Sequence, residues 1–598
     1  MNGIRSVNTP RSIVAVALAL SATLAVALAH AQSAQALVIS PLDGTPDASP
    51  RTQISFLDVA PGQLVDVSVV GSRSGTHAGR LQPYASEPGM SFLPSSPFAP
   101  GETVTVSALV GPPSHRLRVQ DSFTVAQPAP YVPHFSQHSK PAPPVGPGEV
   151  QSFASEPGLD PPSVQVAVDS PQATPGDVFL APAAGPGQHG PMIVDGAGNL
   201  VWFKSAPTDE VAEDFQVEHY QGQPVLVWWQ GVITSFGTGL GTDEVYNTSY
   251  QPVAQIKAGN GYTADLHEAQ ITPSGAAFIT AYSLVYTNLS SAGGASDGIL
   301  ADAIVQEVDV KTGLVMFEWH ALGHVALTDS YTHPGAAGEP WDWFHVNSIS
   351  LDPWGDGNFI ISSRNTWAAY EISKHTGAIM WRIGGRHSSF RMGAGTGTAW
   401  QHDARWQPDH TLTIFDDGST PPEHSQSRAI RERINWRDRS VELIGRYVHT
   451  PPVLTGSQGN DQVLPDGDSF VGWGEEPFLT EFSPSGQVLF SARLPPNGQS
   501  YRAYRFAWSG QPTTPPAIAV KQTGAGTQTV YASWNGATGV SAWRILGGTS
   551  ASALSPLATA PREGFETGIP LASPDSWFAA QALGPDGQVM ATSPAAQS

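Results

Sequence analysis

The sequence predicts an all-β protein, and three observations support this class. Charged residues make up only 13% of the 598 residues, about half the usual share for a soluble globular chain. Gly and Pro together make up about 19%, against an average near 12%, which favours many turns and short strands over long helices. Apolar and polar residues alternate in short runs, which is the period of a half-buried strand. At about 150 residues per domain, the length allows about four domains.

The charge balance and the absence of cysteine exclude several function classes. Lys and Arg number 29 and Asp and Glu number 51, so the net charge is −22. A nucleic-acid partner is not expected, because no basic field exists to neutralise phosphates. The absence of cysteine removes disulfides, thiol nucleophiles, Cys-ligated zinc, iron–sulfur clusters and lipid attachment through Cys. The 18 histidines are the most versatile chemical groups left.

Residues 1–36 are predicted to be a secretory signal peptide. Arg5 and Arg11 precede an apolar run over residues 13–29, and small-residue cleavage signals follow at 29–31 or 34–36, which is the order of such a peptide. The alternative, an uncleaved membrane anchor, has an apolar core a little short for a span. Because no other stretch of about 20 apolar residues exists, we expect a soluble protein that is secreted or held in the cell envelope, without stable membrane insertion.

Two small β-sandwiches are predicted at the ends of the mature chain. Residues 37–126 alternate at period two between regular turns, which indicates an immunoglobulin-like sandwich. The Pro-rich stretch 127–162 is typical of a semi-rigid linker. Residues 517–598 resemble a fibronectin type III module, with Trp534 and Trp543 as expected core anchors. The alternative for 517–598 is an extension of the central domain.

The central domain, residues 163–510, carries a degenerate repeat. A polar turn ending in Gly stands before an apolar strand at 194–198, 309–313, 373–377 and 483–486. Each unit is a β-hairpin that cannot bury its own face. Radial stacking of such sheets gives a β-propeller and protects their edges. A span of about 350 residues suits about six four-stranded blades, so we expect a six-bladed propeller; a β-helix or a long sandwich is the alternative.

Candidate chemical groups concentrate in the middle of this domain. Eight of the 18 histidines lie between His267 and His402, and His267, His345 and His402 stand beside predicted strands among other polar residues. His345 and Asn347 are two residues apart, so on a strand both point to one face. Arg364 ends an apolar strand, which is unusual unless it reaches a solvent cavity or an anion.

These five groups suit a tetrahedral oxyanion ester if a propeller channel brings them together. Arg offers a bidentate fork to sulfate or phosphate oxygens, and Asn or a protonated His donates to the others. A neutral imidazole can attack the central atom, while a second His moves the proton of the leaving oxygen.

Structural roles compete with this interpretation. We leave six other histidines as structural or surface groups: His320, His324, His333, His375, His387 and His424. Arg364 could form a structural ion pair. The tryptophans at 341, 343, 367, 381 and 400 are expected to be packing anchors.

Zinc or copper binding is a further alternative. His134/His138 and His320/His324 have H-x-x-x-H spacing, but that spacing places two rings on one face only in a helix. No H-E-x-x-H motif occurs, and an Arg beside the main cluster would repel a cation. We therefore predict no metal site and no cofactor.

The order of several motifs resembles the arylsulfotransferase family, and the resemblance covers most of the central domain. The motifs are FHVNSI (344–349), ISSRN (361–365), GAIMWRIGG (377–385), QHDA (401–404), IFDD (414–417), VLPDG (463–467) and GWG (472–474). The resemblance implies a six-bladed propeller. It also implies transfer of sulfate from an aryl sulfate to a phenol without a nucleotide donor.

The resemblance assigns roles residue by residue. It implies that His402 is the sulfated nucleophile, that Arg364 binds sulfate with Asn347 and His345, and that His267 is the remaining catalytic histidine. The sequence is closer to a divergent, actinobacterial- and fungal-style secreted branch than to the periplasmic enzymes. Those enzymes are expected to carry cysteines and a different N-terminal domain.

The sequence is compatible with three functions. The first is an exported sulfotransferase acting on small aryl sulfates and phenols. The second is a sulfate-ester hydrolase on the same site, with water in place of the acceptor. The third is a non-enzymatic propeller whose terminal domains contact a cell surface or polysaccharide.

Overall fold

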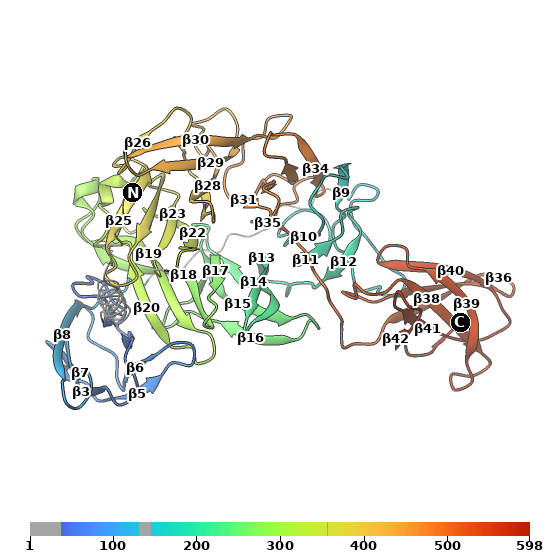
Figure 1. The fold of residues 1–598 in the computed structure, drawn as a ribbon, viewed down its shortest axis with the longest axis horizontal. Coiled ribbons are helices and arrows are strands. Elements are labelled where there is room, and N and C mark those ends of the chain that lie inside the picture. The colour runs from blue at the N-terminus through green and yellow to red at the C-terminus, as the bar shows by residue number, and fades with distance from the viewer. Residues whose placement is uncertain (1–36, 131–144, 356) are drawn as a thin grey trace, which may run out of the picture.

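The computed structural model of the chain describes residues 37–130, 145–355 and 357–598 (Figure 1). Within these ranges the chain forms strands, two 3-10 turns, η1 (Ser290–Ala292) and η2 (Leu327–Asp329), and no α-helix. The predicted all-β class is confirmed. The same ranges contain no helix with the length and apolarity needed to cross a membrane. The predicted signal peptide, the centre of the predicted linker and the His134/His138 pair lie outside the described residues.

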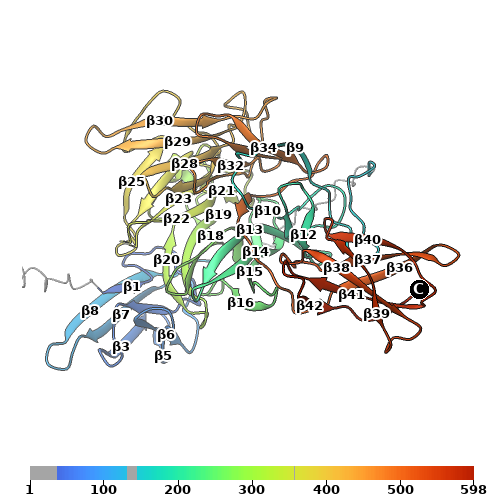
Figure 2. The same cartoon turned by 45° about the vertical axis from the view of Figure 1, so that its right-hand side comes forward.

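Two four-stranded sheets at the N-terminal end enclose one apolar core (Figure 2). Alternate residues of β7 (Val104, Val106 and Ala108) are fully buried in this core, as the period of the sequence predicts. The first sheet has the order β1 (Val38–Ser40), β2 (Ile54–Leu57), β6 (Gly89–Pro94) and β5 (Gly79–Pro83). The second has the order β4 (Gly75–Thr76), β3 (Leu64–Gly71), β7 (Thr103–Val110) and β8 (Leu117–Thr124).

The central strands form six antiparallel sets. The first contains β10 (Asp177–Leu180), β11 (Met192–Val194), β12 (Leu200–Phe203) and β35 (Ala503–Phe506). The second contains β13 (Val211–Tyr220), β14 (Gln223–Ile233), β15 (Gly239–Asn247) and β16 (Pro252–Ile256). The third contains β17 (Ala264–Ile271), β18 (Ala276–Thr287), β19 (Gly298–Asp309) and β20 (Val315–His320), with β21 (Trp341–Asp342) parallel to β19. A single pair, Gly241–Ala264, joins the second and third sets into one sheet.

The other three sets complete the central group. The fourth contains β22 (Val346–Leu351), β23 (Phe359–Ser363), β24 (Ala368–Ile372) and β25 (Ile379–Gly384). The fifth contains β27 (His402–Trp406), β28 (Thr411–Asp416), β29 (Arg428–Asn435) and β30 (Ser440–Tyr447), with β26 (Arg391–Met392) beside β30. The sixth contains β31 (Asn460–Val463), β32 (Ser469–Gly472), β33 (Phe478–Phe482) and β34 (Val488–Arg493), with β9 (Gln165–Asp169) on its edge.

Six inner strands contact one another in a closed series. β13 contacts β17, β17 contacts β22, β22 contacts β27, β27 contacts β31, β31 contacts β35, and β35 returns to β13. The two ends of the central region are also joined, because β35 pairs with β10 and β34 pairs with β9. Residues far apart in the sequence therefore meet along these inner strands.

The predicted turns and most of the predicted tryptophan anchors agree with the structure. The glycines that end the four repeat turns (Gly198, Gly313, Gly377 and Gly486) all have positive φ, which a residue without Cβ adopts at no steric cost. The tryptophans at 341, 343, 381 and 400 are at most 9% exposed. Trp367 is only half-buried.

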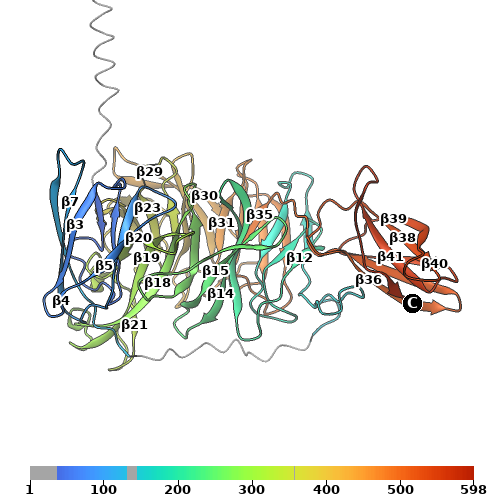
Figure 3. The ribbon, with the colours of Figure 1, turned by 90° about the horizontal axis from the view of Figure 1, so that it is seen from below.

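The C-terminal strands form two further sheets around their own core, at the opposite end of the molecule from β1–β8 (Figure 3). Trp534 and Trp543 are both buried there, at 4% and 1% exposure. One sheet has the order β36 (Ala517–Gly524), β37 (Thr527–Ser533) and β40 (Glu566–Ala572). The other contains β39 (Ser555–Pro561), β38 (Ala542–Gly548), β41 (Trp577–Leu583), β42 (Val589–Thr592) and β43 (Ala596–Gln597).

Candidate active site

The three predicted histidines come from three neighbouring inner strands. His267 lies on β17, His402 begins β27, and His345 directly precedes β22. All three are at most 6% exposed. The pairing of β17 and of β27 shifts register beside the histidine, and His345 has a φ of 58°. The backbone is thus irregular where the imidazoles project. Bulges and left-handed residues change the direction in which a side chain points.

The imidazole rings of His267 and His345 are in contact, and Tyr501 lies between His267 and His402. The rings of His267 and His345 meet edge to face, with centroids 4.8 Å apart. The ring of Tyr501 lies 5.6 Å from His267 and 6.4 Å from His402. Burial lowers the pKa of His267, and the neighbouring His345 ring lowers it further.

Each of these histidines has a carboxylate at Nδ1. The Nδ1–oxygen distances are 2.6 Å for His267 with Asp265, 2.5 Å for His345 with Asp342, and 2.8 Å for His402 with Asp417. A carboxylate at Nδ1 holds a proton there and orients the ring. The reactive nitrogen of each ring is therefore Nε2.

The hydrogen bonds of His402 define its tautomer. The backbone N–H of Gln458 donates to His402 Nε2 at 3.3 Å, so Nε2 carries the lone pair and Nδ1 carries the proton. Burial, followed by the positive charge of Arg364, holds the pKa of His402 well below its usual range. His402 is thus a neutral imidazole with its lone pair on Nε2, the form that a nucleophile requires.

Arg364 lies near enough to His402 for its positive charge to lower the pKa of that imidazole. Its guanidinium donates to Asn365 Oδ1 at 3.1 Å and to the Gly456 carbonyl at 3.4 Å, and neither acceptor is charged. The guanidinium also lies over the Trp400 ring, 5.0 Å from its centroid. A guanidinium whose direct acceptors are neutral keeps a strong attraction for an anion.

Asn347 is held next to His402 by hydrogen bonds of both its side chain and its backbone carbonyl. Its Nδ2 donates to the Gln401 carbonyl at 2.8 Å, next to His402. Its own carbonyl accepts from Tyr501 Oη at 3.0 Å and from Arg502 at 2.9 Å. The amide nitrogen has a second N–H, which remains available as a donor.

A buried ionic network lies directly behind Asn347. Arg502 is fully buried and contacts Asp214 at 3.0 Å, Glu268 at 3.2 Å and Asp403 at 3.4 Å. Arg405 bridges Glu268 and Asp403 at 2.6 and 2.7 Å. Two guanidinium groups thus hold three carboxylates in place, which fixes the inner strands relative to one another.

A cavity of about 880 Å³ adjoins this network. Its lining includes Arg405 and Tyr504 and none of the three site histidines. The chemistry of the cluster therefore does not coincide with this cavity.

Several functional residues were not predicted from the sequence. Asp265 and Asp342 stand two and three residues before their histidines, so D-x-H and D-x-x-H were available local signals. Asp417 directly follows β28, the hairpin partner of β27, whereas Tyr501 and the Gln458 amide come from segments that are distant in sequence.

Other histidines that the sequence left as structural have separate partners. His424 pairs with Asp416 at 2.8 Å, and His387 approaches Asp329 at 3.4 Å. His324 Nδ1 bonds the His320 carbonyl at 2.8 Å, so this H-x-x-x-H pair does not present two rings to one point.

The arrangement places three buried histidines, an arginine and an asparagine among the inner strands of an all-β domain. Residues 216–494 match the model of the family described as Arylsulfotransferase (ASST). This part of the chain is therefore an arylsulfotransferase-family domain, as the sequence motifs predicted. At the level of the family, the match supports a sulfotransferase-type enzyme with small aryl substrates.

Solved structures resemble the chain only weakly. A protein of unknown function from Bacteroides caccae has 11% identity and a TM-score of 0.35, covering 56% of this chain and 99% of its own. A quinonprotein alcohol dehydrogenase-like protein from Bacteroides thetaiotaomicron has 9% identity and a TM-score of 0.26, covering 77% and 96%. The NanB sialidase from Streptococcus pneumoniae has 9% identity and a TM-score of 0.22, covering 79% and 69%. No curated protein sequence matches the chain.

Proposed function

We propose that the protein is an exported sulfotransferase that moves sulfate from an aryl sulfate ester to a phenol through a sulfated His402, without a nucleotide donor. The observation that carries this proposal is the neutral imidazole of His402, whose lone pair on Nε2 is set by Asp417 and the Gln458 amide. Arg364 stands close enough to lower the pKa of that imidazole. A nucleophile beside an anion-binding cation is the minimum that sulfuryl transfer requires.

The architecture belongs to the same proposal. The closed series of inner strands supports a six-bladed propeller over 163–510, in which β35 completes the first blade. The separate cores support β-sandwich domains over 37–126 and 517–598, with a linker over 127–162. Export rests on the signal-peptide pattern of residues 1–36, and N-terminal sequencing of the secreted protein tests it.

The first half-reaction forms a nitrogen–sulfur bond. Arg364 binds two sulfate oxygens, and the free N–H of Asn347 donates to a third. His402 Nε2 attacks sulfur as the bond from sulfur to the aryl oxygen breaks. The proton on His402 Nδ1 stays on the ring, hydrogen-bonded to the Asp417 carboxylate. That carboxylate stabilises the positive charge that develops on the ring.

A second histidine protonates the leaving aryl oxygen. Burial lowers the pKa of His267, and the neighbouring His345 and Arg502 lower it further, which disfavours a proton there. We therefore assign the acid role to His345, whose Nδ1 is bonded to Asp342, so that Nε2 is the nitrogen that transfers the proton. The released phenol leaves with that proton.

The second half-reaction reverses these steps with a new acceptor. The acceptor phenol gives its proton to His345 Nε2, its oxygen attacks sulfur, and the nitrogen–sulfur bond breaks. If water takes the acceptor's place, the same site is a sulfate-ester hydrolase. Trp400 lies under Arg364, and Trp367 meets Trp400 at 5.2 Å, which favours an aromatic acceptor over water.

The test is sulfuryl transfer from a chromogenic aryl sulfate with and without added phenol. We expect phenol-dependent release of the chromophore, and a sulfuryl group on His402 when phenol is omitted. His402→Ala should abolish both, while His410→Ala, at an exposed ring stacked on Trp354, should retain both. An acceptor-independent rate would identify a hydrolase. Full activity of His402→Ala would refute the mechanism, and no turnover by the intact protein would favour a binding domain.

A further inference from the structure

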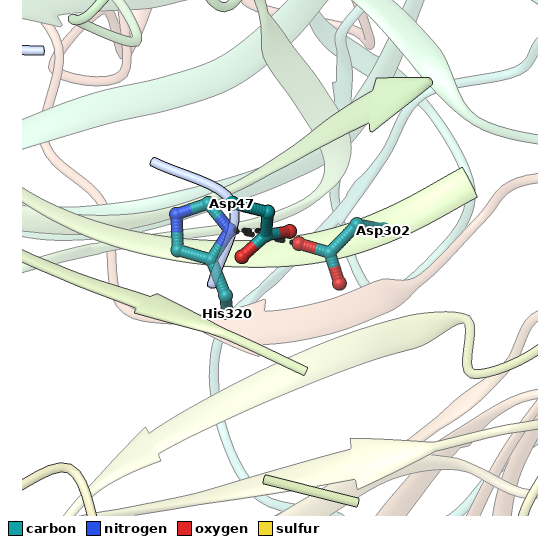
Figure 4. A group of neighbouring side chains, drawn as sticks. All are labelled: Asp47, Asp302 and His320. Atoms are coloured by element: carbon teal, nitrogen blue, oxygen red, sulfur yellow. Dashed lines mark hydrogen bonds and ion pairs between the residues drawn. The ribbon is translucent and has the colours of Figure 1, made fainter. Parts of the chain in front are cut away.

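A second buried cluster lies where the N-terminal sheets meet β19 and β20. Asp302 on β19 and His320 at the end of β20 approach one another from adjacent strands, and Asp47 comes from the loop between β1 and β2 (Figure 4). The three residues are at most 4% exposed. Their donor atoms all lie within 4.8 Å of one another.

We propose that Asp47, Asp302 and His320 form a binding site for one divalent first-row transition metal ion, with Zn²⁺ as the expected occupant. His320 Nδ1 lies 2.8 Å from Asp302 Oδ2 and 3.3 Å from Asp47 Oδ2. In tetrahedral coordination at about 2.0–2.1 Å, donor atoms lie about 3.3 Å apart. The observed spacing therefore needs only small side-chain rotations to accept an ion.

The buried carboxylate of Asp47 is evidence for a cation at this site. The contact of Oδ2 with His320 Nδ1 is long, at 3.3 Å, and neither oxygen accepts a hydrogen bond of good geometry, although the side chain is only 4% exposed. Figure 4 shows this carboxylate turned toward His320 and Asp302. Burying a carboxylate without a hydrogen bond costs free energy that metal coordination restores.

The environment of His320 matches that of a metal-binding imidazole. Its Nε2 donates to Glu318 Oε1 at 3.0 Å, and the other oxygen of Glu318 accepts from Asn260 at 2.8 Å and Gln306 at 2.6 Å. A carboxylate that holds one ring nitrogen presents the other nitrogen as a ligand. Glu318 thus orients the ring so that Nδ1 faces Asp47 and Asp302.

The excess of carboxylates around His320 also favours a bound cation. Asp47, Asp302 and Glu318 carry three formal negative charges around one imidazole. Within the described ranges, no lysine or arginine side chain forms an ion pair with any of these carboxylates. One imidazole with two carboxylates is a donor set for zinc or manganese, whereas Ca²⁺ prefers oxygen alone.

The bound ion would connect two parts of the chain that the sequence separates by about 250 residues. The contact is already built from neutral bonds, such as Ser49 Oγ to the Asn260 carbonyl and Tyr84 Oη to the Val315 carbonyl at 3.1 Å. The ion would join the N-terminal sheets to β19 and β20. This role is structural and independent of sulfuryl transfer.

Metal binding to the full chain tests the proposal. Protein stripped with EDTA is titrated with ZnCl₂, with MnCl₂, and with CoCl₂, whose visible absorption reports its coordination. We expect one equivalent of zinc to bind, a tetrahedral cobalt spectrum, and a thermal midpoint that rises with free zinc.

Asp47→Asn should weaken zinc binding at least tenfold. The variant should fold, because it keeps the shape of the side chain and loses only the long 3.3 Å contact with His320, and Asp47→Ala repeats the test. Asp43→Asn is the matched control, since Asp43 lies in the same segment but bonds Ser122; it should bind as the parent does. No stoichiometric metal in the parent, or unchanged binding by both Asp47 variants, would overturn the proposal. It would leave a protonated His320 as the partner of these carboxylates.

Discussion

Replacing Asp417 with asparagine should lower the activity, because it disturbs the orientation of His402, without lowering the stability of the fold. Asp417 Oδ2 accepts the His402 Nδ1 proton at 2.8 Å, and its other oxygen has no partner. A hydrogen bond to a charged group contributes about 1.5–3 kcal/mol, which corresponds to roughly a 10- to 150-fold change in rate. The amide can also donate to Nδ1, which would place the ring proton on Nε2 and remove the attacking lone pair. We therefore expect kcat/KM to fall at least tenfold, and about 10³-fold or more if the tautomer inverts.

The same substitution should not destabilise the protein. Burial raises the pKa of Asp417 well above its usual range and Arg364 only partly opposes that shift, so keeping the carboxylate charged beside His402 costs stability, and an amide of the same shape removes that cost. The assay pairs chromophore release with the thermal midpoint, and Glu432→Gln serves as a control at another buried carboxyl group, 0% exposed. Parental activity in Asp417→Asn would refute the assigned tautomer. A large fall in its midpoint would show that Asp417 acts on the fold.

Four further predictions follow from the same contacts. Arg364→Lys keeps the charge but loses the planar fork, so kcat/KM for the aryl sulfate should fall about 10- to 100-fold; an unchanged value in steady-state kinetics would contradict sulfate binding by Arg364. Because the pKa of His402 lies well below 6.5, the acid limb of kcat/KM in the parent should fall below pH 6.5, and a limb at or above that pH would contradict a buried neutral nucleophile. Burial raises the pKa of Glu432 from 4.5 to about 8, so its contribution to stability is lost as pH rises through that range; Glu432→Gln should raise the thermal midpoint above pH 8 and leave it unchanged below pH 4.5. Arg502→Met removes the partner of Asp214 and should lower the free energy of unfolding by about 3–5 kcal/mol in guanidinium titrations, and a smaller loss would show that the network is not needed for stability.

The sequence anticipated the strands better than it anticipated the contacts of the site. Alternation along residues 103–110 and the glycine that ends each repeat turn are local signals, and they correspond to β7 and to turns with positive φ. His267, His345 and His402 were found because each stands in a recognisable motif. The carboxylates at Nδ1 were not found: Asp265 and Asp342 are close in sequence to their histidines and were a missed local signal, whereas Asp417 meets His402 only when β27 and β28 lie side by side.

The candidate metal site also depends on contacts that local sequence patterns do not reveal. The H-x-x-x-H spacing drew attention to His320 and His324, but His320 ends a strand and the two rings do not converge. The residues that do converge on His320 are Asp302, from the neighbouring strand, and Asp47, from another sheet system. Spacing rules describe one helix or one strand, so they do not detect a site assembled across an interface.

The amino-acid sequence by itself determined the all-β class, the family and the types of residue available for chemistry. Local turn and strand preferences, and the order of short motifs, are properties of neighbouring residues. Tertiary structure alone decided that Asp417 and the Gln458 amide would set the tautomer of His402, and that Tyr501 and Arg502 would support Asn347 from behind. These contacts depend on closure of the central strands, because only the packing of β35 against β13 and β31 carries residues 501 and 502 into a site built from residues 267–402.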